Sequence, residues 1–508
     1  MKMRIAEAVK ESPFLLGDLI NWPAKLYPDK PAISWDGAYI SYADLQNRVI
    51  ERAAHLSGLG ISRFQRWGLV YPNCAEFVVS LIALMRLGAV AVPLGIRYPA
   101  AKIRLLGERV RLAGILVANT PGGQERLSAA FSAWQPRNVD DHTLALQNPS
   151  SDPLAAVEPQ RGIDLDPALI LLTSGSTGAS HGVVLQHHAI LANLRANICE
   201  LGYRDEDRTL VVLPMSHAYA LIHQVLAHLL LGATVYLSST PIVPQALWRR
   251  LDRERITTLS IAPPLVPVVV KALEGRKCLQ DMRLLSIGAA RTEPEHLAKL
   301  VPLLKKTSIA LTYGLTEAGP RVSTHFVTGG KFNPRSIGAP LPNVEVRLSG
   351  AGDTASELLV RSRAISNRSA EEPFAEGQDN VLHTGDVARF SGGDLELEGR
   401  LRRTLNRGGF LIAPQDIEDT LRRHHEVGDA FVKGDLDGAL GEVPVAFVSP
   451  RQGATIDIVE LRRYCAAHLS PEERPVRFIV VDAIDRAGDK QKMLTSASLG
   501  LTLKTCFD

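Results

Sequence analysis

Short apolar runs alternate with longer stretches of helical spacing over most of this chain, and this alternation limits the possible folds more than any other feature. Apolar runs at 67–71 and 89–93, for example, flank a helical pattern at 75–87. Such a pattern predicts α/β architecture, in which helices cover parallel sheets. Beyond Ser336 the strands become shorter and more alternating, which predicts an antiparallel subdomain.

The length of 508 residues, 45% of them hydrophobic, allows a large core and indicates two or more domains. A boundary is expected near 399–403, because the residues after it have a helix and strand pattern of their own. We therefore expect an N-terminal domain over 1–398, a linking segment at 399–402 and a small α+β domain over 403–508.

Charge and cysteine content exclude several classes of protein. The 57 basic and 54 acidic residues are interspersed, so the chain has no basic stripe for nucleic acid. Five scattered cysteines without a C-x-x-C pair predict neither a disulfide framework nor a cysteine metal site, and they fit a reducing cytoplasm. Charges at Glu7, Lys10 and Glu11 argue against a secretory signal. Polar residues interrupt the most apolar region, 210–237, so no membrane span is expected.

A loop rich in glycine and hydroxyl groups follows the apolar strand at 169–172. Its glycines allow a close approach of the backbone to an anion, and its hydroxyl and N–H groups are donors for phosphate. The loop residues are Thr173, Ser174, Gly175, Ser176, Thr177 and Gly178. No lysine stands in the Walker position, so a P-loop NTPase is disfavoured. A plain polar connection is the alternative for such a loop taken alone.

Four further polar, glycine-bearing stretches occur in order along the chain, most of them at predicted strand ends, where open α/β sheets bind ligands. They are SIGAA at 286–290, LTYGLTEAG at 311–319, HTGD at 383–386 and GRLRRTLNRGGFLIAPQDIE at 399–418. With these motifs the chain resembles the adenylate-forming superfamily of acyl-CoA synthetases, free-standing adenylation enzymes and firefly-type luciferases, from about Phe14 to Leu494. The resemblance implies layered mixed sheets with a small antiparallel barrel-like subdomain, followed by a mobile C-terminal lid.

The resemblance implies an ATP and Mg²⁺ site. The loop at 173–178 would hold the β- and γ-phosphates, Tyr313 would stack near adenine, Thr316 would contact phosphate and Glu317 would help to hold Mg²⁺, which prefers oxygen ligands. The remaining nucleotide-binding residues that it implies are Gly288, Ala289, Ala290, Gly314, Asp386, whose carboxylate would accept the ribose hydroxyls, and Arg400.

Three departures from the family pattern concern charge and mobility. Ser180 and His181 stand where relatives carry proline and lysine after the phosphate loop. Lys490 takes the place of the lysine that bridges substrate and α-phosphate, but Asp489 replaces the glycine of that motif, and Lys492 is an alternative. Arg402 falls at the hinge, where most relatives carry aspartate or lysine, and rotation about it is expected to bring the Gly408-Gly409 turn toward a pantetheine arm.

The resemblance places His217 at the acyl pocket, where it gates or lines the site. Amino-acid-activating relatives carry an aspartate at the next position, but this chain has Ala218, so an unpaired ammonium would be costly and an amino acid is disfavoured. An aromatic or medium-sized apolar acid is favoured, as in hydroxycinnamate and aryl-acid ligases. The implied substrate-binding residues are His217, Ala218, Tyr219, Gly288, Gly314, Leu315 and Ala318. Arg291 either pairs with a second polar group of the substrate or points to solvent.

The expected reaction forms an acyl-adenylate from the carboxylic acid and ATP, releases pyrophosphate and passes the acyl group to a thiol. Lys490, His217, Thr316 and Glu317 are the expected catalytic residues. The acceptor is coenzyme A or the phosphopantetheine of a carrier protein, and a cytoplasmic monomer or homodimer is expected. A degenerate member that binds acyl or nucleotide ligands without turnover is the alternative, and a luciferase-like oxygenase is a more distant one.

Overall fold

The chain forms two compact units in the computed structural model. The N-terminal unit comprises residues 1–96, 107–172 and 182–401, and the C-terminal unit comprises residues 97–106, 173–181 and 402–508. The structure describes residues 15–35, 37–119, 127, 131–149, 166–174, 180–238, 242–276, 279–327, 333, 335–350, 355–366, 370, 381–391, 394–401, 404–484 and 493–494.

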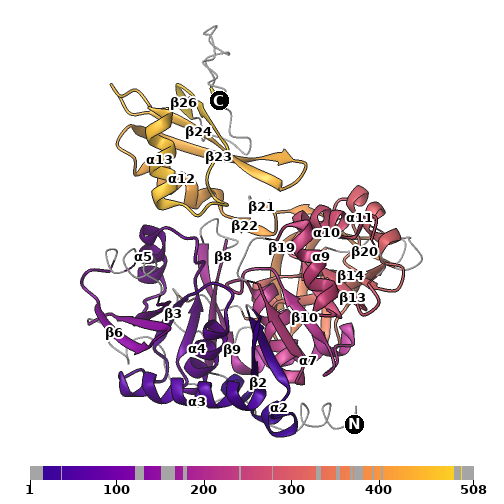
Figure 1. The fold of residues 1–508 in the computed structure, drawn as a ribbon. Helices are drawn as coiled ribbons and strands as arrows, with labels where there is room; N and C mark the ends of the chain where they lie inside the picture. Colours follow the sequence, from indigo (N-terminus) through magenta and orange to yellow (C-terminus); the bar gives the residue numbers. More distant parts are fainter. Residues whose placement is uncertain are drawn as a thin grey trace. The chain divides into compact units, whose positions relative to one another are not determined.

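Three sheets build the N-terminal unit (Figure 1). The first has the order β16 (Ala339–Pro340), β15 (Arg321–Val327), β14 (Ser308–Gly314), β13 (Leu284–Ile287), β12 (Thr258–Ile261), β10 (Arg208–Val211), β11 (Thr234–Leu237), β1 (Pro31–Trp35) and β2 (Ala38–Ser41). The second has the order β6 (Gln135–Asp140), β7 (Thr143–Gln147), β5 (Gly114–Ala118), β3 (Arg66–Val70), β4 (Val90–Pro93), β8 (Pro167–Ser174) and β9 (Ser180–Gln186). The third is antiparallel and consists of β17 (Val344–Leu348), β18 (Ser356–Ser362), β19 (Val381–Ser391) and β20 (Asp394–Arg400).

Helices cover these sheets. The helices described before residue 402 are η1 (Leu16–Asp18), α2 (Asn21–Leu26), α3 (Tyr42–Gly58), α4 (Ala75–Arg86), α5 (Ala100–Arg109), α7 (His187–Leu201), η3 (Tyr219–Leu226), α8 (Ala227–Leu231), α9 (Pro244–Arg253), η4 (Pro263–Leu265), α10 (Val266–Leu273), α11 (Pro294–Leu300), η5 (Val301–Leu303) and η6 (Thr316–Ala318), and most of α5 belongs to the C-terminal unit. The sequence of α4 is apolar all round, and its residues 75–85 are all buried, as expected of a helix enclosed between layers. Helix α9 instead buries only Leu247 and Leu251 and covers the outside.

Two apolar cores lie on opposite faces of the nine-stranded sheet. The larger core combines residues of the seven-stranded sheet, such as Leu69, with residues of the nine-stranded sheet, such as Val211, and with α4 and η3. The second core packs α9, α10 and α11 against β12 and β13. The nine-stranded sheet is therefore covered on both faces, as parallel sheets require.

The C-terminal unit is a smaller α+β structure. Its sheet consists of β22 (Phe410–Ile412), β21 (Leu405–Arg407), β24 (Gly441–Pro450), β23 (Val427–Asp437) and β25 (Arg477–Val480), and β26 (Ala483–Ile484) pairs with β27 (Met493–Leu494). Helices α12 (Pro414–Arg422) and α13 (Ile458–His468) bury apolar side chains such as Ile417 and Leu461 against this sheet. The Asp457 side chain caps α13 by accepting hydrogen bonds from the backbone N–H groups of Val459 and Glu460.

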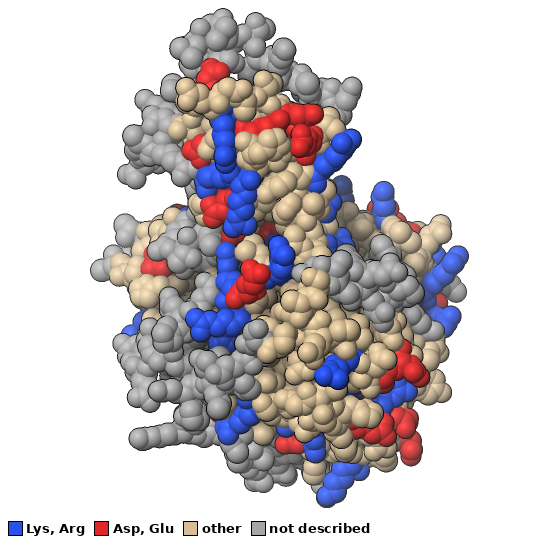
Figure 2. Space-filling view, turned by 90° about the vertical axis from the view of Figure 1, so that its left-hand side faces the viewer, with Lys and Arg blue, Asp and Glu red and all other residues tan. Residues whose placement is uncertain are grey.

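The predicted fold class is confirmed: mixed sheets with helices, an antiparallel subdomain and an α+β C-terminal part are all present. The domain boundaries at 398 and 403 stay predictions, and Arg402 lies outside the described residues. Among the described helices, none is long and apolar enough to cross a membrane. Basic and acidic side chains are interspersed on the face shown in Figure 2.

Candidate active site

Several predicted site segments meet at one edge of the nine-stranded sheet. Strands β10, β12, β13 and β14 are parallel neighbours, so their carboxyl ends point the same way. The segments that follow three of them are 212–219 after β10, 288–290 after β13 and 315–318 after β14. This is the edge at which open α/β sheets bind ligands. The predicted substrate residues therefore lie on connections that share this edge.

Two glycines on these connections are required by close packing. A Cβ on the buried Gly288 would lie 2.2 Å from Thr312 Oγ1 and 2.8 Å from Tyr219 Cζ. A Cβ on Gly314 would lie 1.9 Å from the Pro320 carbonyl oxygen. All three distances are shorter than the contacts that real Cβ atoms make. Only glycine therefore fits at these two positions without rearrangement of the neighbouring atoms.

Tyr313, Asp386 and Arg400 converge from three strands of two different sheets. Tyr313 Oη donates a hydrogen bond to Asp386 Oδ2 over 2.6 Å, and Arg400 Nε donates to Asp386 Oδ1 over 2.6 Å. The Asp386 side chain is buried, and its backbone N–H donates to Thr384 Oγ1. Burial and the neighbouring Asp386 carboxylate raise the pKa of Tyr313 well above its usual value. Asp386 is therefore a fixed acceptor whose oxygens keep lone pairs for hydroxyl groups of a ligand.

Glu317 and Thr316 lie half-buried in η6, directly after β14. The Glu317 carbonyl oxygen accepts a hydrogen bond from the Ser366 backbone N–H over 2.8 Å, which fixes the position of this turn. A carboxylate and a hydroxyl at the end of a strand are oxygen donors of the kind that Mg²⁺ prefers. The donor set therefore fits the predicted metal ion.

The phosphate loop is described at its start. Thr173 is near the end of β8, and its Oγ1 is buried without a hydrogen-bond partner among the described residues. A buried hydroxyl in this condition is costly unless a ligand or water pairs with it, which fits a phosphate group. Ser174 ends β8, and Gly175, Ser176, Thr177 and Gly178 lie outside the described residues, as do Lys490 and Lys492.

The segment that holds His217 leads into η3, which is a π-helix. His217 and Tyr219 are half-buried, and Ala218 is buried. Tyr219 Oη donates to Ser286 Oγ over 3.1 Å and accepts from Thr312 Oγ1 over 3.3 Å. Burial raises the pKa of the Tyr219 phenol, so it stays protonated. Tyr219 is thus held against the ends of β13 and β14.

The other predicted residues at this edge differ in exposure. Leu315 is half-buried and Ala318 is buried. Ala289 is exposed, with a left-handed φ of 69°, and Ala290 is half-buried. The Arg291 side chain is exposed, as expected of the alternative in which it points to solvent.

A buried polar cluster behind Tyr219 was missed in the sequence. The His223 ring stacks on the Tyr219 ring, with centroids 4.5 Å apart. Arg321 is buried, and its Nη1 donates to Asn197 Oδ1 over 2.7 Å and to His223 Nδ1 over 3.0 Å. His223 Nδ1 also lies 3.0 Å from Asn197 Oδ1, and its Nε2 faces Ser286 Oγ at 3.2 Å. Burial and Arg321 lower the pKa of His223 well below its usual value.

No carboxylate is within hydrogen-bond distance of Arg321 among the described residues, and its Nε has no partner there. The only signal for this cluster in the sequence is the charged residue at the start of a strand, directly after Pro320. A local pattern cannot show that this residue meets His223 and Asn197.

This fold and site define a large α/β protein with a candidate ligand site at a polar sheet edge and a second, small α+β unit. A family model described as AMP-binding enzyme matches residues 20–366, and one described as AMP-binding enzyme C-terminal domain matches residues 416–489. The chain belongs to the AMP-binding enzyme family, and so to the adenylate-forming superfamily.

Known proteins of this kind align with most of the chain. A methyl-dioxo-octahydroindenyl-propanoyl:CoA ligase of Mycobacterium tuberculosis is 30% identical over 94% of this chain and 99% of its own length. The 4-coumarate–CoA ligase 5 of Oryza sativa subsp. japonica is 29% identical over 89% of this chain and 87% of its own. The fold is similar to that of an o-succinylbenzoate CoA synthetase of Bacillus subtilis, with a TM-score of 0.78, 21% identity and coverage of 94% of this chain and 97% of that one.

The family assignment fixes the class of reaction. The protein is an AMP-forming acid–thiol ligase, which activates a carboxylic acid as an acyl-adenylate with release of pyrophosphate and then transfers the acyl group to a thiol. Its CoA-ligase relatives use ATP and coenzyme A.

Proposed function

We propose that this ligase activates an aromatic or medium-sized apolar carboxylic acid with MgATP. This proposal rests on the wall that Tyr219, Ala218 and Gly288 form at the carboxyl edge of the sheet. These three residues supply an aromatic ring and no carboxylate. Ala218 has no carboxylate to pair with the ammonium group of an amino acid. An unpaired buried charge costs on the order of 3–5 kcal/mol. The coumarate and indenyl-propanoyl ligases carry names that indicate ring-bearing acids.

Different side chains of the site bind the nucleotide and the metal ion in this proposal. Asp386, held by Tyr313 and Arg400, accepts the ribose hydroxyls. Thr173 and the loop that follows it donate hydrogen bonds to the terminal phosphates. Thr316 contacts a phosphate group, and Glu317 helps to hold Mg²⁺, which would supply charge neutralisation for the phosphates.

Catalysis in this proposal rests on positioning and on charge stabilisation. His217 lines or gates the acyl pocket, and Tyr219 fixes one of its walls through Ser286 and Thr312. In the first step, Lys490 neutralises charge between the acid and the α-phosphate. Rotation about Arg402 then removes Lys490 and brings the Gly408-Gly409 turn toward the pantetheine arm. The thiol is that of coenzyme A or of a carrier protein, and the protein acts as a monomer or a homodimer.

Exchange of labelled pyrophosphate into ATP tests the proposal directly. The purified protein is assayed with benzoate, hydroxycinnamate, medium-chain fatty acids and amino acids. We expect exchange with one or more aromatic or apolar acids and none with amino acids. Exchange with amino acids alone would contradict the proposed substrate class. A second step with coenzyme A or a phosphopantetheinylated carrier protein then identifies the acceptor from the thioester formed.

A further inference from the structure

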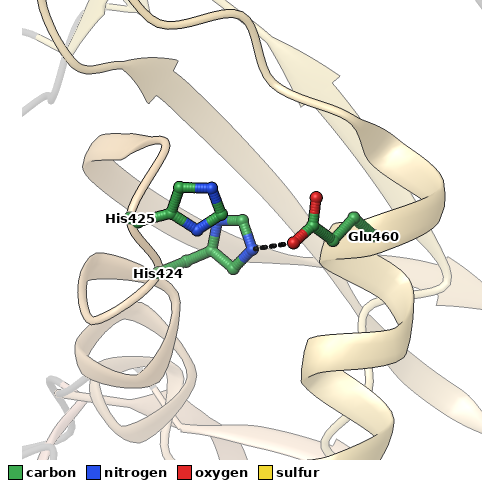
Figure 3. Close-up of side chains that lie close together, drawn as sticks. All are labelled: His424, His425 and Glu460. Atoms are coloured by element: carbon green, nitrogen blue, oxygen red, sulfur yellow. Dashed lines mark ion pairs between the residues drawn. The ribbon is translucent and has the colours of Figure 1, made fainter.

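Two histidines and a glutamate lie together in the C-terminal unit. His424 and His425 follow the end of α12, and Glu460 lies in the first turn of α13 (Figure 3). One ligand atom from each of the three residues lies within 4.8 Å of the others. The reaction proposed above gives none of them a role, and they come from segments 35 residues apart in the chain (425 to 460).

One of these residues is fixed in place and the other two are accessible. The His424 side chain is 3% exposed, and its Nε2 lies 4.0 Å from Glu460 Oε1. The His425 ring lies against the His424 ring, with centroids 4.6 Å apart and an interplanar angle of 37°. The side chains of His425 and Glu460 are 70% and 51% exposed. The cluster thus has a rigid anchor and two side chains that are able to rotate toward it.

We infer that His424, His425 and Glu460 bind a divalent transition metal ion, with Zn²⁺ the best chemical match. Two imidazoles and one carboxylate are the donor set of many zinc sites, whereas Mg²⁺ and Ca²⁺ prefer oxygen ligands alone. Three protein ligands leave a fourth position for water. The ion would join the end of α12 to the start of α13 and so stabilise this unit.

The distances fit such a site after small side-chain movements. Ligand atoms around tetrahedral Zn²⁺ are about 3.3 Å apart, given metal–ligand distances of about 2.0–2.2 Å. The 4.0 Å between His424 Nε2 and Glu460 Oε1 must therefore shorten by roughly 0.7 Å. Because the Glu460 side chain is exposed, its rotation is able to shorten this distance while the buried His424 stays in place.

The neighbouring groups bear on which ring nitrogens would bind. Glu426 Oε1 lies 3.9 Å from His425 Nε2, which is beyond hydrogen-bond length, so either nitrogen of the exposed His425 ring is able to turn toward the ion. The Glu426 backbone N–H donates to His424 Nδ1 over 3.4 Å, and this bond is given up when the ion takes Nε2 and the proton moves to Nδ1. At that length the bond is weak, so its loss opposes binding little.

Metal titration of the untagged, chelator-treated protein tests the inference without reference to ligase activity. Zn²⁺ is titrated by calorimetry, and Co²⁺ is titrated by visible absorption, since tetrahedral Co²⁺ with nitrogen and oxygen ligands absorbs more strongly than Co²⁺ in water. The variants are His425→Ala and Glu460→Gln, because both side chains are exposed and their loss leaves the core of the unit intact. His55→Ala, an exposed histidine on α3 of the N-terminal unit, is the matched control.

We expect one saturable Zn²⁺ site in the wild type and in His55→Ala, with affinity lowered at least about tenfold in each of the other two variants. Zn²⁺ should also raise the unfolding temperature of the wild type and of His55→Ala more than that of His425→Ala or Glu460→Gln. Weak binding without saturation at one equivalent, or equal affinity in all four proteins, would overturn the inference. Either result leaves the proposed ligase function untouched, because that function is measured by pyrophosphate exchange.

Discussion

Tyr313 Oη and Asp386 Oδ2 are 2.6 Å apart, and the hydrogen bond between them links the nine-stranded sheet to the four-stranded sheet. The first residue lies next to the end of β14, the strand that precedes Glu317, and the second lies within β19. One carboxylate therefore connects the part of the site that leads to the metal ion with the part assigned to ribose. Because the Asp386 side chain is buried, a change at this residue affects both the part of the site that leads to the metal ion and the part assigned to ribose.

Asp386→Asn should impair nucleotide binding. The variant keeps the shape of the side chain but removes the charge that Arg400 and Tyr313 contact. A hydrogen bond to a charged group contributes about 1.5–3 kcal/mol, so we expect kcat/KM for ATP to fall roughly 10- to 100-fold. Pyrophosphate exchange at varied ATP concentrations measures the change. Tyr313→Phe removes one of the two contacts and should cause a smaller loss; an unchanged KM for ATP in Asp386→Asn would contradict the assignment.

Lys490→Ala should abolish adenylate formation while Lys492→Ala retains it. Removal of one group that stabilises developing charge typically lowers the rate about 100- to 1,000-fold. Pyrophosphate exchange measures the first step, and thioester formation from a synthetic acyl-adenylate measures the second. The second step should survive in Lys490→Ala, because the lysine acts on the α-phosphate. Loss of exchange only in Lys492→Ala would show that the catalytic lysine is Lys492.

The free energy of unfolding should fall as the pH is lowered from about 6.5 to about 4, in part because of His228. Its ring is buried, with Nδ1 donating to the Gln224 carbonyl oxygen over 2.7 Å and Nε2 accepting from Thr258 Oγ1 over 3.1 Å. Burial lowers the pKa of His228 from 6.5 to about 4. Between these values the unfolded chain binds a proton that the folded chain does not, so the stability present above pH 6.5 is lost by roughly 1.4 kcal/mol per pH unit.

Urea unfolding at several pH values, with wild type and His228→Gln compared, measures this effect. The variant lacks the titrating ring, so its stability should decline less steeply over the same interval. His223, whose pKa is lowered by burial and by Arg321, acts in the same direction in both proteins. Parallel curves for the two proteins would show that His228 does not contribute.

Gly288→Ala should damage the substrate site, whereas Gly58→Ala should not. The added methyl group at 288 would meet Thr312 and Tyr219, and overpacking of this kind costs about 1–3 kcal/mol. We expect a raised KM for the acid, because Tyr219 must move. At Gly58, in the last turn of α3, nothing lies within 4 Å of an added Cβ, and a gain of about 0.4–1 kcal/mol in stability is expected. Equal acid KM values in the two variants would contradict the role of Gly288.

The local pattern of residues determined most of the elements and the edge at which the site lies. Apolar periodicity located helices such as α3 and α4, since a helix or strand with one buried face has a repeat that is visible in sequence. The glycines at 288 and 314 marked the strand ends, because an added Cβ would meet side chains at 288 and the Pro320 backbone at 314. Ordered motifs also identified the superfamily.

The tertiary structure alone decided which distant segments meet. Strand β1 (Pro31–Trp35) pairs with β11 (Thr234–Leu237), which comes far later in the chain. Arg321 meets His223 across 98 residues, and His424 lies beside Glu460 from another helix. Periodicity records which face of an element is buried but not what buries it. Such contacts depend on how sheets and helices pack after they form, so they were absent from the local sequence pattern.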